Sequence, residues 1–163
     1  AALTIGGKYN FYHCTFANYW TGGTRQFPTL LLTNYYKDIN ENTIPRNLDS
    51  AFFYNCIVYG SLDSSEIKLD ESTSAAFNYK FHNCLLKTNL STTSSQYENV
   101  IVNLNPYFNN VGNNDYRIRN PLALPAVIDK GDPAISALYP DDLSMRSRFP
   151  NPPGDIGAYE YDP

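Results

Sequence analysis

Charge is scarce in this sequence. Asp, Glu, Lys and Arg account for only 17% of its 163 residues, whereas an average soluble protein has about 25%. The net charge is −4, and the basic residues come closest together only as Arg117 with Arg119 and Arg146 with Arg148. A nucleic-acid-binding protein needs a cationic surface that neutralises phosphates. The composition therefore argues against a nucleic-acid partner.

Long apolar runs are also missing. No segment approaches the roughly 18 apolar residues that a membrane helix needs, so we predict no membrane span. The N-terminus lacks the charged stretch followed by an apolar one that marks a secretion leader. Its first residues, Ala1 to Ile5, are typical of the interior of a fold. We expect this chain to follow the N-terminal part of a longer parent chain.

The residues that usually cover exposed helix surfaces are sparse, and aromatic and amide side chains take their place. Aromatics make up 15% of the chain with 14 Tyr, and there are 19 Asn. Tyr and Phe favour strands, and Asn favours turns. The balance predicts β-structure with many turns.

One eight-residue pattern occurs three times, as residues 9–16, 51–58 and 79–86. Each copy contains Phe-x-[His/Asn]-Cys-x-apolar, and the copies are 42 and 28 residues apart. Repeats of about 20 to 30 residues are normal for solenoids. The longer interval then requires an inserted loop, for which the polar segment 35–48 is the candidate. Further strands are expected within 27–33 and 65–70.

The spacing inside this pattern predicts a bend. In an unbroken strand, Phe and Cys three residues apart would face opposite sides of the sheet, yet both are residue types that are usually buried. A single residue in the left-handed conformation between them removes the conflict, and Asn and His are among the residue types that adopt it. Stacked coils would then place like residues above one another. The predicted ladder consists of Phe11, Phe53, Phe81, His13, Asn55, Asn83, Cys14, Cys56 and Cys84.

Three cysteines in an exported protein would suggest a disulfide with one free thiol. Metal sites usually contain close pairs such as Cys-x-x-Cys, which are missing here. The repeat instead favours buried free thiols that pack as small hydrophobic residues. The alternative to a solenoid is that the three copies are unrelated strands of an antiparallel sandwich.

Four motifs follow one another in the C-terminal third, at residues 105–108, 113–118, 126–131 and 154–161. They read Asn-Pro-Tyr-Phe, Asn-Asn-Asp-Tyr-Arg-Ile, Ala-Val-Ile-Asp-Lys-Gly and Gly-Asp-Ile-Gly-Ala-Tyr-Glu-Tyr. In this order they resemble the ending of bacterial right-handed parallel β-helix proteins (pectate-lyase-like) with a choice-of-anchor Q domain. Two steps depart from the family: Leu124–Asp129 replaces Ser-Pro-Ala-Ile-Asp, and the arginine step is matched only loosely by Asp142 with Arg146 or Arg148.

The resemblance implies an all-β fold, the last few coils and the C-terminal cap of a right-handed parallel β-helix. Residues 1–98 would form coils with the loop insertion at 35–48, and residues 99–163 the final coil and the cap. The cap would cover the otherwise open last coil. We expect Asp129 and Asp155 to bond to turn amides, and Glu160 to pair with Arg146 or Arg148.

The same resemblance implies an exported or cell-surface bacterial protein. Many parallel β-helices degrade polysaccharides, but no catalytic residue, metal ligand or cofactor site is predicted in this chain. The carboxylates Asp63, Glu66, Asp70 and Glu71 are interpreted as a solvated loop, and the paired acids of the cap as turn residues. Whether a metal ion binds the Asn- and Asp-rich turns stays open.

The remaining functional signal is aromatic. Tyr19 with Trp20 and Tyr35 with Tyr36 adjoin expected loops, where aromatic rings can stack on sugars. The alternative is that they only pack these loops onto the scaffold. The preferred hypothesis is a non-catalytic segment that binds glycans or mediates adhesion. The rivals are the end of a polysaccharide lyase or glycoside hydrolase with upstream catalytic coils, and a purely structural stalk.

Overall fold

A computed structural model describes residues 2–119, 126–149 and 153–161. The chain consists mainly of short strands, with one 3-10 helix and one short α-helix in the described part. These elements are β1 (Ala2–Ile5), β2 (Gly7–Tyr12), β3 (Thr15–Asn18), β4 (Leu30–Thr33), β5 (Tyr35–Lys37), β6 (Thr43–Pro45), β7 (Leu48–Tyr54), β8 (Ile57–Gly60), β9 (Ile67–Asp70), β10 (Phe77–His82), β11 (Leu85–Leu86), β12 (Tyr97–Glu98), β13 (Ile101–Val102), β14 (Phe108–Asn110), η1 (Val111–Asn113), β15 (Asp115–Ile118) and α1 (Pro133–Leu138).

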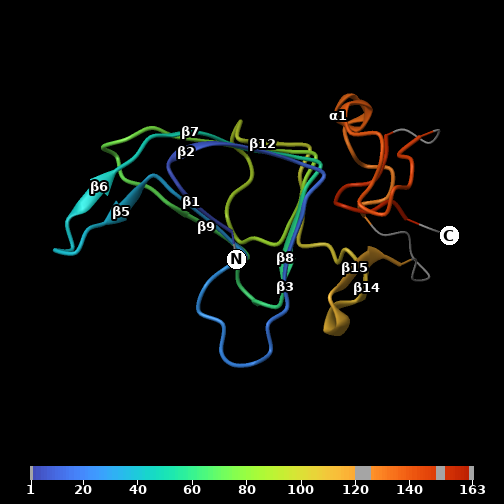
Figure 1. The fold of residues 1–163 in the computed structure, drawn as a ribbon, viewed down its shortest axis with the longest axis horizontal. Coiled ribbons are helices and arrows are strands. Elements are labelled where there is room, and N and C mark those ends of the chain that lie inside the picture. The colour runs from blue at the N-terminus through green and yellow to red at the C-terminus, as the bar shows by residue number, and fades with distance from the viewer. Residues whose placement is uncertain (1, 120–125, 150–152, 162–163) are drawn as a thin grey trace.

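Three parallel sheets are built from successive passes of the chain. Sheet I has the order β1-β4-β9, sheet II β2-β7-β10-β12, and sheet III β3-β8-β11-β13. In Figure 1 the strands of successive passes lie over one another, so that the three sheets enclose a common interior. The prediction of a mainly β-stranded fold is confirmed. The parallel pairing contradicts the antiparallel sandwich.

The register brings the repeated residues together. Phe11 pairs with Phe53, and Phe53 with Phe81. Their stacked rings are 4.8 and 4.7 Å apart between centroids. In the neighbouring column the Cys14 amide donates to Cys56 Sγ, and the Cys56 amide to Cys84 Sγ, each at 3.4 Å. All three cysteines are free thiols.

The chain turns from sheet II into sheet III at a left-handed residue in every pass. His13, Asn55 and Asn83 have φ of 49°, 53° and 49°, which is the conformation that the sequence pattern predicts. Asn99, with φ of 52°, makes the same turn in the fourth pass. The sequence pattern missed this fourth turn because Val100 stands where the other copies have cysteine.

The predicted loop 35–48 is a hairpin for most of its length. Strands β5 and β6 pair antiparallel, with Tyr36 opposite Ile44. Figure 1 shows this hairpin projecting from the edge of the stack. Leu48 is fully buried as the first residue of β7, so the insertion ends before it.

The C-terminal segment, meaning the described residues 126–149 and 153–161, corrects the prediction of an end cap. It packs against the outer face of sheet III along the flank of the stack, as Figure 1 shows. Its Ile156 and Val127 bury Ile57 and Leu85, which face outward from sheet III. The sequence carried a signal for this contact, because paired apolar residues such as Ile57-Val58 indicate a strand buried on both faces.

Candidate functional site

The loop that follows β3 is anchored by a buried ion pair. Arg25 contacts Glu66 at 2.7 Å, and their side chains are 6% and 0% exposed. Arg25 also donates to the Asn18 carbonyl at 2.7 Å. Glu66 accepts further hydrogen bonds from the amides of Thr29 and Leu62. One carboxylate therefore fixes the loop after β3 to the turn after β8.

This arrangement corrects the interpretation of Glu66 as part of a solvated loop. Burial acts to raise the pKa of Glu66, but hydrogen bonds from Arg25 and Thr29 outweigh it, so that the pKa lies below its ordinary value. Its partner Arg25 lies 41 residues earlier in the chain. Sequence reasoning missed the pair because no local pattern connects the two positions.

Trp20 stands exposed at the start of the anchored loop. It is the only tryptophan of the chain, and its side chain is 63% exposed. The Trp20 amide donates to Asn18 Oδ1 at 3.2 Å. A Cβ atom at Gly22 would collide with the Trp20 ring, so a larger residue there would displace it. The ring therefore lies against Gly22 while most of it remains open to solvent.

A groove of about 460 Å³ lies beside this ring, within the size range of small-ligand sites. We call it the Trp20 groove. Its lining includes Asn18, Tyr19, Trp20, Thr21, Asn114 and Tyr116. The lining therefore combines uncharged amides and hydroxyls with aromatic rings.

Tyr19 forms part of the groove wall. Its ring lies 6.3 Å from that of Tyr116, nearly parallel to it, and 6.2 Å from Phe108 in an edge-to-face arrangement. Burial raises the pKa of Tyr19, so its hydroxyl stays neutral at physiological pH. Tyr19 therefore connects β3 to the β14–β15 hairpin, as the packing alternative expects, whereas Trp20 stays available.

The other predicted aromatic pair lies elsewhere. Tyr35 and Tyr36 belong to β5, in the hairpin on the far side of the stack from β14 and β15 in Figure 1. The Tyr35 hydroxyl donates to Asp70 at 2.9 Å. Arg46 lies 5.4 Å above the Tyr36 ring centroid. The four predicted aromatic residues therefore do not form one site.

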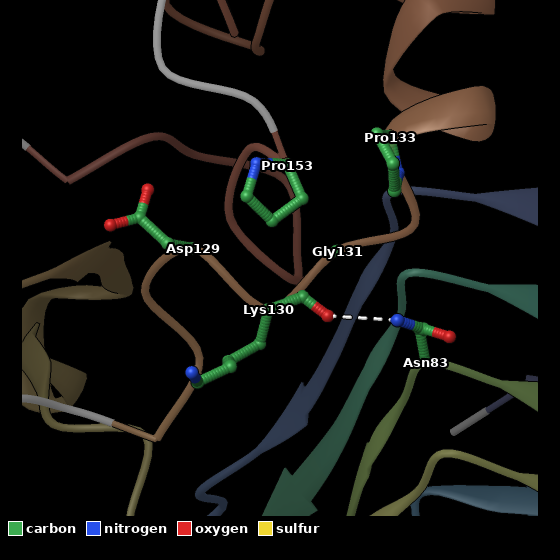
Figure 2. A pocket seen from close by; sticks show the side chains of 6 residues that line it. All are labelled: Asn83, Asp129, Lys130, Gly131, Pro133 and Pro153. Carbon is green, nitrogen blue, oxygen red and sulfur yellow. Dashed lines mark hydrogen bonds between the residues drawn. The ribbon is translucent and has the colours of Figure 1, made fainter.

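A second hollow lies between the C-terminal segment and the column of turn residues, with a volume of about 570 Å³. The side-chain amide of Asn83 donates to the backbone carbonyl of Lys130 at 3.0 Å. Figure 2 shows this bond, and it shows the Asp129 and Lys130 side chains extending away from Asn83. Pro133 and Pro153 supply much of the remaining wall. This hollow is a junction between two parts of the fold, and few side-chain polar groups converge on it.

Of the predicted cap carboxylates, those of Asp155 and Glu160 bond within the C-terminal segment, whereas Asp129 contributes its backbone amide. Asp155 accepts from the amides of Asp129 and Tyr161 at 2.8 and 2.6 Å, and burial raises its pKa. Glu160 forms an ion pair with Arg148, which identifies Arg148 rather than Arg146 as its partner. These groups hold the segment together. Leu124 and Pro125 of the family-like motif lie outside the described residues.

Among the described residues, no group of three or more His, Cys, Asp or Glu side chains is arranged to hold a metal ion. In the same ranges, no helix has both the length and the hydrophobicity to span a bilayer. No family model, curated protein or solved structure matches the chain.

Proposed function

We propose that this chain is a non-catalytic, carbohydrate-binding segment of an exported or cell-surface protein, and that Trp20 is its central contact. One observation carries the proposal. A largely exposed indole, on a loop that a buried ion pair anchors, borders a groove lined by neutral hydrogen-bonding groups. A sugar offers an apolar C–H face for stacking and hydroxyl groups for hydrogen bonds, and the groove has partners for both.

The proposed scaffold is the end of a bacterial right-handed parallel β-helix of the choice-of-anchor Q type. Columns of Phe, Cys and Asn in three parallel sheets support a solenoid. Its first pass leaves Phe11 only partly covered, whereas Phe53 and Phe81 are fully buried. In this proposal, coils of a longer parent chain cover that edge, because unpaired strand edges are normally protected.

Binding to a panel of immobilised polysaccharides tests the function. Trp20→Ala should weaken binding at least about tenfold, which corresponds to about 1.4 kcal/mol. Tyr36→Ala is the matched control, because Tyr36 is also an exposed aromatic residue but lies on the hairpin. Equal loss in both variants, or no loss in Trp20→Ala, would contradict a site at the Trp20 groove.

A further inference from the structure

Trp20 also borders a second, separate hollow. This hollow, the Phe27 hollow, has a volume of about 350 Å³ and is lined by Asn18, Trp20, Thr24, Arg25, Gln26 and Phe27. It shares only Asn18 and Trp20 with the Trp20 groove. The indole therefore stands at the boundary between two adjacent concave surfaces.

The Phe27 hollow has an exposed aromatic ring of its own. The Phe27 side chain is 68% exposed, although burial is the normal state of phenylalanine. Arg25 donates to the Phe27 carbonyl at 3.3 Å, so the ion pair that anchors the loop also holds this residue. Both exposed rings therefore belong to the loop that this ion pair anchors.

Free hydrogen-bonding groups line both hollows. The Asn18 and Asn114 side-chain oxygens accept from Trp20 and Tyr116, but their amide nitrogens have no partner in the described part of the chain. The hydroxyls of Thr21 and Thr24 are likewise unpaired there. These groups can bond to hydroxyls of a ligand.

The charge of the two linings is balanced. Arg25 is the only charged residue among the described residues that line either hollow, and Glu66 pairs with it at 2.7 Å. Selecting an anionic or cationic sugar would require an unpaired charge of the opposite sign. The Arg25–Glu66 pair provides none.

We propose that the ligand is a neutral oligosaccharide of at least two units, which spans the Trp20 groove and the Phe27 hollow across the indole. This inference rests on the proposed carbohydrate-binding function. It assigns Phe27 as a second stacking residue and identifies uncharged sugars as the ligand class.

Calorimetric titration with sugars of defined length provides the test. The neutral probes are malto-, cello-, manno- and xylo-oligosaccharides from monosaccharide to hexasaccharide. Oligogalacturonides and chitosan oligomers of the same lengths are the charged probes. The variants are Trp20→Ala, Phe27→Ala and, as a control, Ile39→Ala, which alters a 97% exposed residue of the β5–β6 hairpin.

We expect at least one neutral series to bind, with affinity that rises from the monosaccharide to longer oligomers and is insensitive to NaCl. Phe27→Ala should weaken binding of the tetrasaccharide about tenfold and Trp20→Ala at least as much, while Ile39→Ala changes nothing. Affinity that does not grow with length, or an unaffected Phe27→Ala, would overturn the two-hollow span.

Other outcomes distinguish a failure of this inference from a failure of the proposed carbohydrate-binding function. Preferential, salt-sensitive binding of a charged series that Trp20→Ala abolishes would overturn the neutral class and leave the binding site standing. Binding of no series at all would overturn the proposed function itself.

Discussion

Inside the three parallel sheets Phe53 touches one phenylalanine on each side, in contacts that repeat from pass to pass. Along the flank, Asn55 exchanges two hydrogen bonds with the Asp132 backbone, whereas Asn83 makes a single one to the Lys130 carbonyl. The interior is thus a periodic column, whereas the C-terminal segment is attached by individual contacts. Periodic contacts leave a pattern in the sequence, and single long-range contacts do not.

The largest expected effect lies in the periodic interior. Phe53→Ala removes a fully buried ring from the middle of its column, which should lower the free energy of unfolding by about 3–5 kcal/mol. Denaturant unfolding measures this loss. Phe27→Ala is the matched control, because its exposed ring should contribute less than about 0.5 kcal/mol. Similar losses in both variants would show that the column does not form the core.

The next effect is a pH dependence of stability that arises from His13, one of the left-handed turn residues. Burial lowers the pKa of His13 to about 4, and the Arg148 charge adds to this shift. A histidine that resists protonation in the folded state contributes full stability above its unfolded pKa near 6.5. That contribution falls away as the pH drops from about 6.5 to about 4, for a loss of about 3 kcal/mol. Thermal unfolding across this range measures it.

His13→Asn is the matched variant, because asparagine occupies the same position in the other passes. Asp155 and Glu160, whose pKa values burial raises, act in the opposite direction, since they stabilise the fold as the pH falls. Both proteins share them, so the difference isolates His13. If wild type and variant lost equal stability on acidification, His13 would not be the cause of that loss.

A smaller effect concerns the attachment of the C-terminal segment. Asn55→Gly keeps the left-handed turn accessible but removes the side-chain bonds to Asp132, which should cost about 2 kcal/mol. Asn55→Ala should cost about 1 kcal/mol more, because alanine strains the positive φ. Hydrogen exchange should accelerate in the C-terminal segment and not in β7 and β10. Uniform acceleration would contradict a separately attached segment.

The periodic interior could be predicted from the sequence better than the attachment of the C-terminal segment. The left-handed turns at His13, Asn55 and Asn83 could be predicted because three residue types recur at fixed offsets. The outward burial of Ile57 was indicated by the apolar pair Ile57-Val58, but its partner Ile156 could not be identified, because the two residues lie 99 positions apart and their contact occurs once. An end cap was the expectation, since the sequence does not state where a turn-rich segment folds back.

The candidate site was predictable only in part. Trp20 could be singled out because it follows a predicted strand and precedes two glycines. The ion pair that anchors its loop could not, since Arg25 and Glu66 belong to different passes and Glu66 resembled a solvated acid. Phe27 was expected inside a strand, whereas β4 begins only at Leu30 and leaves the Phe27 ring exposed.

The most direct test of the central claim is the fluorescence of the single tryptophan during titration with neutral oligosaccharides. Trp20 is largely exposed in the free protein, so stacking on a sugar should shift its emission to shorter wavelength and protect it from acrylamide quenching, with saturation. Ile39→Ala should respond in the same way. An emission spectrum that stays unchanged while calorimetry detects binding would place the carbohydrate elsewhere and contradict a site centred on Trp20.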